Sequence, residues 1–204
     1  MEREYIIYAA YMLVFLLIFG FMIGIPLLAF NSDMTSAYGA IHAANICHQK
    51  LSRSLCIFTD GKGYWIGDCT PQTGEFITNP LDWSTIKVEN DGVVGYKMAV
   101  CARDFGIYGA MLLGGLVYPF VRNIRDRRVP PAIYLVAALV PIGIDGTLQL
   151  VSEIGLLPFI YESTNLIRLL TGGIAGFAAA FYTIALLVNL FTEMKEAPEK
   201  HTKK

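Results

Sequence analysis

Four long apolar stretches alternate with polar segments along the chain. A helix that crosses the hydrocarbon core of a bilayer needs about 20 mostly apolar residues, and four ranges meet this requirement: 5–30, 98–121, 132–151 and 165–191. The segment 31–97 carries many Gly, Asp, Asn and Thr residues and is too polar to cross. The pattern therefore predicts an all-α membrane protein with four transmembrane helices in one membrane domain, 1–204.

Positive charges beside these stretches predict the orientation. Four arginines crowd the short connection between the second and third helices, and four lysines follow the fourth. Because Lys and Arg are enriched in cytoplasmic flanks, we expect both termini in the cytoplasm (N-in/C-in), with a cytoplasmic tail at 192–204. The segment 31–97 is then external, and its part 36–58 is a candidate interfacial helix. The predicted location is the cell membrane, as a multi-pass protein whose main partner is the lipid bilayer.

Composition agrees with a membrane protein and excludes one other class. Hydrophobic residues make up 54% of the 204 residues and charged residues only 16%, which is too apolar for an ordinary soluble domain. The net charge of −1 gives no broadly basic surface for nucleic acid. We expect no nucleic-acid partner.

Polar side chains inside the predicted helices gather near their external ends. They are Arg103, Asp104 and Tyr108 in the second helix, Asp145 and Gln149 in the third, and Asn165 and Arg168 in the fourth. Ends of antiparallel helices share a depth, so Asp104, Asp145, Arg168 and Arg103 should converge in one layer, where an unpaired charge costs several kcal/mol. The sequence leaves two roles open for this layer. One is an ion-paired network, with Asp145 and Arg168 as a candidate pair, and the other is a ligand pocket with Asp145 as candidate base.

The external side also holds the cysteines and possible metal ligands. Cys47, His48, Cys101 and Asp104 are candidate ligands for zinc or another divalent transition metal. The alternative is a pair of disulfides, Cys47–Cys101 and Cys56–Cys69, which an oxidising compartment permits. Spacing alone does not decide between them.

Glycines recur on two of the predicted helices. Gly172 and Gly176 lie one turn apart in the fourth helix, and Gly106 and Gly114 lie on one side of the second. Small residues at such spacing let membrane helices approach closely. We expect these glycines to serve helix packing.

An ordered set of short motifs runs through most of the chain. It reads Cys47-His48-Gln49, Arg53-Ser54, Cys101-Ala102-Arg103, Gly106-Ile107-Tyr108, Pro130-Pro131, Asp145-Gly146, Gln149, Ser163, Asn165, Arg168 and Thr171-Gly172. This set resembles the uncharacterised membrane-protein family called domain of unknown function 2085. The resemblance implies a membrane protein and brings no established activity. In that family the position of Asp104 is often a second cysteine, and exchanging it for Asp keeps a metal ligand but removes a redox pair.

Two hypotheses for function follow. In the first, an external polar pocket binds a metal ion or an anionic, lipid-linked ligand through Arg103, Tyr108, Asp145, Gln149, Asn165 and Arg168. In the second, the chain is a non-catalytic structural subunit of a larger membrane complex or a homo-oligomer. The sequence assigns no reaction to either.

Overall fold

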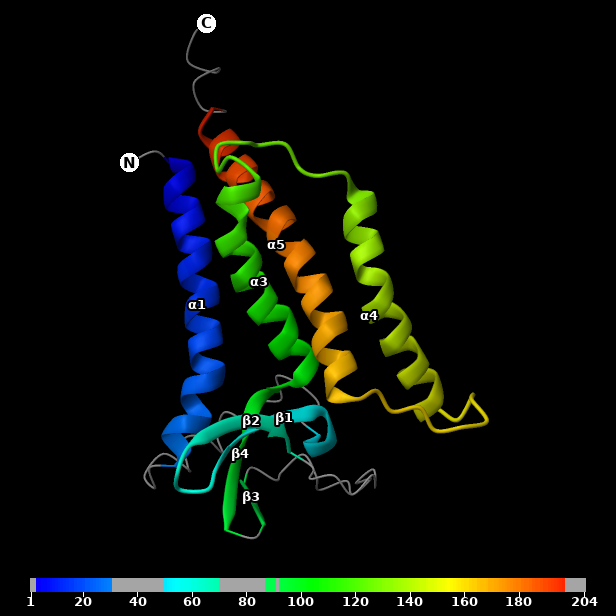
Figure 1. Ribbon diagram of the computed structural model, residues 1–204. Coiled ribbons are helices and arrows are strands. Elements are labelled where there is room, and N and C mark those ends of the chain that lie inside the picture. The colour runs from blue at the N-terminus through cyan, green and yellow to red at the C-terminus, as the bar shows by residue number, and fades with distance from the viewer. Residues whose placement is uncertain (1–2, 31–49, 70–86, 91, 197–204) are drawn as a thin grey trace, which may run out of the picture.

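Four long helices form the body of the protein. The structure, a computed structural model, describes residues 3–30, 50–69, 87–90 and 92–196. Its helices are α1 Arg3–Ala29, α3 Ala102–Val121, α4 Ala132–Glu153 and α5 Asn165–Glu196. Each contains a stretch long and apolar enough to cross a membrane. α1, α3 and α5 lie side by side, and α4 flanks α5 (Figure 1).

The expectation of an all-α fold is wrong, because the chain also forms a four-stranded antiparallel sheet. The strands are β1 Ser54–Thr59, β2 Tyr64–Asp68, β3 Lys87–Asn90 and β4 Val93–Cys101, in the order β2-β1-β4-β3. A short 3-10 helix, η2 Leu51–Arg53, precedes β1. Figure 1 shows the sheet at one end of the helix bundle.

Strand β4 explains one boundary that differs from the expected helices. Residues 98–101 end β4, and α3 begins directly after them at Ala102. The apolar run of the strand continues into the apolar run of the helix, so hydropathy alone reads one long helix there. Of the expected interfacial helix at 36–58, residues 54–58 belong to β1, and residues 36–49 lie outside the described residues.

Each face of the sheet carries its own apolar cluster. Leu55, Ile57 and Met98 face the bundle, where Ile23 and Phe30 pack against them. Because opposed residues in an antiparallel pair share a face, the register puts Cys56, Phe58 and Val88 on the opposite side. There Cys56 forms a disulfide with Cys69. One of the two expected disulfides is therefore present, whereas the other involves Cys47, outside the described residues.

The glycine prediction is confirmed at the α3–α5 contact. A Cβ atom added at Gly106 would lie 2.5 Å from the carbonyl oxygen of Leu169, and one at Gly172 or Gly176 would collide with an α3 carbonyl. The neighbouring Gly173 has nothing within 4 Å of that position. Small residues thus let the α3 and α5 backbones touch. This contact brings the first turns of the two helices together at the end of the bundle that carries the sheet.

Candidate functional site

Polar side chains gather where the sheet meets the first turns of α3 and α5 and the last turns of α4. We call this set the polar layer: Lys50, Arg53, Ser54, Arg103, Asp145, Gln149, Glu153, Tyr161, Glu162, Asn165 and Arg168. Of the four charged residues expected to converge, Arg103, Asp145 and Arg168 belong to this layer, whereas Asp104 accepts a hydrogen bond from Cys101. Five residues of the polar layer are buried, namely Ser54, Asp145, Gln149, Asn165 and Arg168.

Glu162 lies at the centre of the polar layer, in the connection between α4 and α5. Its carboxylate accepts hydrogen bonds from Arg53 Nε at 2.8 Å and Arg53 Nη2 at 3.0 Å. It also accepts from Gln149 Nε2 at 2.8 Å and from Arg168 Nη2. One carboxylate thus joins η2, α4 and α5, three segments far apart in the sequence.

The electrostatics around Glu162 keep this carboxylate ionised. Burial alone would raise the pKa of Glu162, but hydrogen bonds from Arg53 and Arg168 outweigh it and hold the pKa below its ordinary value of 4.5. Burial would lower the pKa of Arg53, whereas its bonds to Glu162 and Glu153 raise it. Both partners are therefore charged at neutral pH, and their attraction offsets part of the desolvation cost.

Asp145 forms a second centre of the polar layer. It accepts hydrogen bonds from Arg103 Nη2 and, at 2.9 Å, from the hydroxyl of Tyr161. The candidate pair of Asp145 with Arg168 is not formed, because Arg168 pairs with Glu162 and Asp145 pairs with Arg103. The expectation counted only charges inside the helices, and Glu162 lies between two of them.

Asn165 ties the start of α5 to the sheet. Its side-chain Nδ2 donates to the backbone oxygen of Ser54 at 3.3 Å, and its Oδ1 accepts from Arg168 Nη1 at 3.3 Å. Asn165 and Arg168 are both buried. The guanidinium of Arg168 is thus held by Asn165 and Glu162, and its side chain is only 2% exposed.

Arg103 differs from the other two arginines of the polar layer. Its Nη2 bonds Asp145, but its Nε is buried and has no hydrogen-bond partner in the described part of the chain. Its side chain is 23% exposed. The next residue, Asp104, accepts a hydrogen bond from Cys101 Sγ at 3.3 Å. Tyr108 lies one turn further along α3 and is half-buried.

The described residues test the metal site only in part. Cys101 and Asp104 lie together, whereas Cys47 and His48 are outside the described residues. Within residues 3–30, 50–69, 87–90 and 92–196, no group of three or more His, Cys, Asp and Glu side chains is arranged to hold a metal ion. The four-ligand set stays a prediction.

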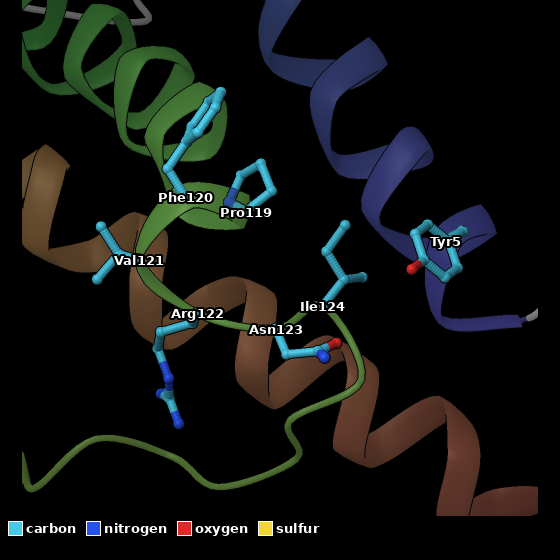
Figure 2. Close-up of a pocket in the computed structure, with 7 residues that line it drawn as sticks. All are labelled: Tyr5, Pro119, Phe120, Val121, Arg122, Asn123 and Ile124. Atoms are coloured by element: carbon cyan, nitrogen blue, oxygen red, sulfur yellow. The ribbon is translucent and has the colours of Figure 1, made fainter.

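A cavity of about 480 Å³ lies at the opposite end of the bundle (Figure 2). Its lining comes from Tyr5 of α1, the last residues of α3 and the turn that follows, 122–124. In Figure 2 the guanidinium of Arg122 points away from Tyr5, and it pairs with Asp126 at 2.6 Å. No residue of the polar layer lines this cavity, so it is not part of the candidate site.

Sequence reasoning missed six members of the polar layer: Lys50, Arg53, Ser54, Glu153, Tyr161 and Glu162. Arg53 belongs to a motif quoted for the family resemblance, but it was not assigned to the site. Glu162 lies only three residues before α5. The available signal was the position of this charged residue directly before a predicted membrane helix whose first turn carries polar side chains.

Comparison with known proteins supports the resemblance seen in the motifs. Residues 92–182 match the model of a family described as "Predicted membrane protein (DUF2085)". Uncharacterized protein MJ1492 of Methanocaldococcus jannaschii is 42% identical over 98 residues, which is 48% of this chain and 58% of the relative. The chain thus spans less than two thirds of that relative. No solved structure matches.

The shifted pKa of Glu162 gives a testable pH dependence. Because the folded pKa lies below 4.5, the stability that Glu162 contributes is fully present above pH 4.5 and is lost as pH falls through the folded pKa. We expect Glu162→Gln to destabilise the protein by about 3–5 kcal/mol at neutral pH. Its melting temperature in detergent should then fall less than that of wild type on acidification below pH 4.5.

A matched control is Glu89→Gln, which removes a carboxylate whose ion pair with Lys87 is solvent-exposed. This variant should show the wild-type acid profile, because an exposed pair contributes little. Parallel acid profiles for wild type and Glu162→Gln would contradict the role given to Glu162.

Proposed function

We propose that this chain is a four-span protein of the cell membrane that binds an anionic group at Arg103. The match of residues 92–182 to the model of a family of predicted membrane proteins (DUF2085) supports the membrane location. The site lies at the end of the bundle that carries the sheet. Both termini are cytoplasmic in this proposal, and the sheet is external. No reaction is part of it.

The observation that carries the proposal is the buried Nε of Arg103, which has no partner in the described part of the chain. A buried donor without an acceptor costs about 1–3 kcal/mol, and buried donors in native networks are nearly always satisfied. Arg53 and Arg168 each direct two nitrogen atoms to acceptors of the polar layer. An oxygen atom of a ligand beside Arg103 would complete the set.

The chemistry of Arg103 favours phosphate or carboxylate oxygens. A guanidinium presents a planar set of donors that suits such groups, and the bond to Asp145 holds it in place. The Arg103 side chain as a whole is 23% exposed, whereas its Nε is buried. The carboxyl groups of Asp104 and Asp145 lie nearby and would repel an anion. A cation bound by Cys101 and Asp104 would reduce this repulsion, and zinc is the natural candidate.

A second candidate function is a non-catalytic subunit of a larger membrane complex. The observation that favours it is charge balance. The polar layer and Asp104 together contain equal numbers of cations and acids. The cations are Lys50, Arg53, Arg103 and Arg168, and the acids are Asp104, Asp145, Glu153 and Glu162. Such a network holds the sheet on the bundle without any ligand, and the sheet is then the surface that a partner subunit would contact.

Replacement of Arg103 by Lys separates the two functions. Lysine keeps a positive charge for Asp145 but lacks the Nε donor. We expect inorganic phosphate, or a short-chain phosphatidic acid, to raise the melting temperature of wild-type protein in detergent, with or without added Zn²⁺. In Arg103→Lys the apparent affinity should fall roughly tenfold or more, because a charge-assisted hydrogen bond contributes about 1.5–3 kcal/mol.

The matched control is Arg127→Lys, which makes the same change in an arginine that pairs with Glu4 at the other end of the bundle. It should respond to the probes like wild type. A response to phosphatidic acid alone identifies a lipid headgroup, whereas a response to both probes identifies phosphate itself. If Arg103→Lys responds like wild type, or neither probe acts beyond chloride of equal ionic strength, anion binding at Arg103 is rejected and the subunit function is favoured.

The proposed orientation has a direct test. Lys62→Cys introduces a thiol in the exposed turn between β1 and β2, and Val129→Cys introduces one in the α3–α4 connection without removing an arginine. In intact cells a membrane-impermeant maleimide should label the first variant above the wild-type level and the second only after lysis. Labelling of Val129→Cys in intact cells would reverse the orientation.

A further inference from the structure

Strand β2 forms one edge of the sheet and exposes apolar side chains. Among the described residues it pairs with β1 on one side only, in the order β2-β1-β4-β3. Tyr64 is 63% exposed and Ile66 is 50% exposed. Large apolar groups on an exposed edge strand are a liability in water, and proteins usually cover or charge such edges.

The register shows which way these side chains point. Tyr64 lies opposite Thr59, and Ile66 lies opposite Ile57. Directly opposed residues in an antiparallel pair share a face of the sheet, and Ile57 belongs to the cluster that packs on the bundle. Tyr64 and Ile66 therefore lie on the bundle-facing side of the sheet.

Trp65, between them, lies on the other side. Its ring stacks on Phe58, its opposite neighbour, with 5.8 Å between the ring centroids. Phe58 packs against the cluster that contains the Cys56–Cys69 disulfide. Strand β2 thus carries Tyr64 on the face toward the bundle and Trp65 on the opposite face, beside Phe58.

The depth of Tyr64 follows from its contact with α1. Its ring lies edge-on to Phe30, 5.3 Å between centroids, and Phe30 directly follows the last residue of α1. Figure 1 shows the β1–β2 hairpin at this end of α1. Because α1 is long and apolar enough to span the bilayer, its end marks the membrane surface. Tyr64 is level with that surface.

We propose that Tyr64 and Ile66 contact the boundary between lipid headgroups and acyl chains, so that β2 is a membrane-facing edge of the sheet. Tyrosine suits this boundary, because its ring is apolar and its hydroxyl reaches water and headgroups. The contact extends the apolar interface between the sheet and the bundle past the end of α1. It depends on α1 spanning the membrane and is independent of ligand binding at Arg103.

The two native tryptophans, Trp65 and Trp83, make a sharp test possible. Trp83→Phe leaves Trp65 as the single tryptophan, whose emission is excited selectively over that of the tyrosines. Combining Tyr64→Trp with Trp65→Phe and Trp83→Phe moves the single indole to the other face of the same strand. Both full-length proteins are placed in phosphatidylcholine and phosphatidylglycerol vesicles, in which part of the lipid carries bromine near the headgroup end of its acyl chains.

The indole at position 64 should emit at shorter wavelength and be quenched by brominated lipid roughly twofold more strongly than Trp65, as expected for an interfacial aromatic. Iodide in the buffer should quench Trp65 more strongly. If Tyr64→Trp does not fold, Ile66→Trp supplies the same face. Equal lipid quenching on both faces overturns the proposal. So does an indole at position 64 shielded from both quenchers, which would show that protein covers β2.

Discussion

The ion pairs of Glu162 are the interaction on which this structure depends most. Arg168 is almost fully buried at the start of α5, and Arg53 lies at the end of η2, directly before β1. A buried guanidinium without a partner would destabilise the fold by several kcal/mol. Glu162 compensates both arginines and also binds Gln149 of α4. The sheet, α4 and α5 are therefore joined at one carboxylate.

The rest of the architecture brings these groups together. Strand β4 runs directly into α3, so the sheet and the first turn of α3 form one continuous element. Glycines allow α3 and α5 to touch, which places Arg103 near the polar start of α5. Asp145 then ties α4 to α3 through Arg103. In this arrangement Arg103 keeps one buried donor without a partner among the described residues, and ligand binding is proposed there for that reason.

The sequence predicted the helices and much of the polar layer, because both follow from strong physical rules. About 20 apolar residues are needed to cross a bilayer, and polar groups inside such helices must find one another. The sheet was missed because β1, β2 and β3 are short, and the last residues of β4 merge with the apolar run of α3. Glu162 and Arg53 were missed because they lie outside the helices. Whether Arg168 pairs with Asp145 or with Glu162 depends on how the helices are rotated, which periodicity does not give.

The central claim is that Glu162, and not Asp145, compensates Arg168. A double-mutant cycle tests it most directly, with the free energy of unfolding in detergent measured for Glu162→Gln, Arg168→Gln and their combination, and for the matching cycle of Asp145→Asn with Arg168→Gln. We expect a coupling energy of about 1–3 kcal/mol between Glu162 and Arg168, and near additivity, within about 0.5 kcal/mol, between Asp145 and Arg168. Additive effects of Glu162→Gln and Arg168→Gln would contradict the account.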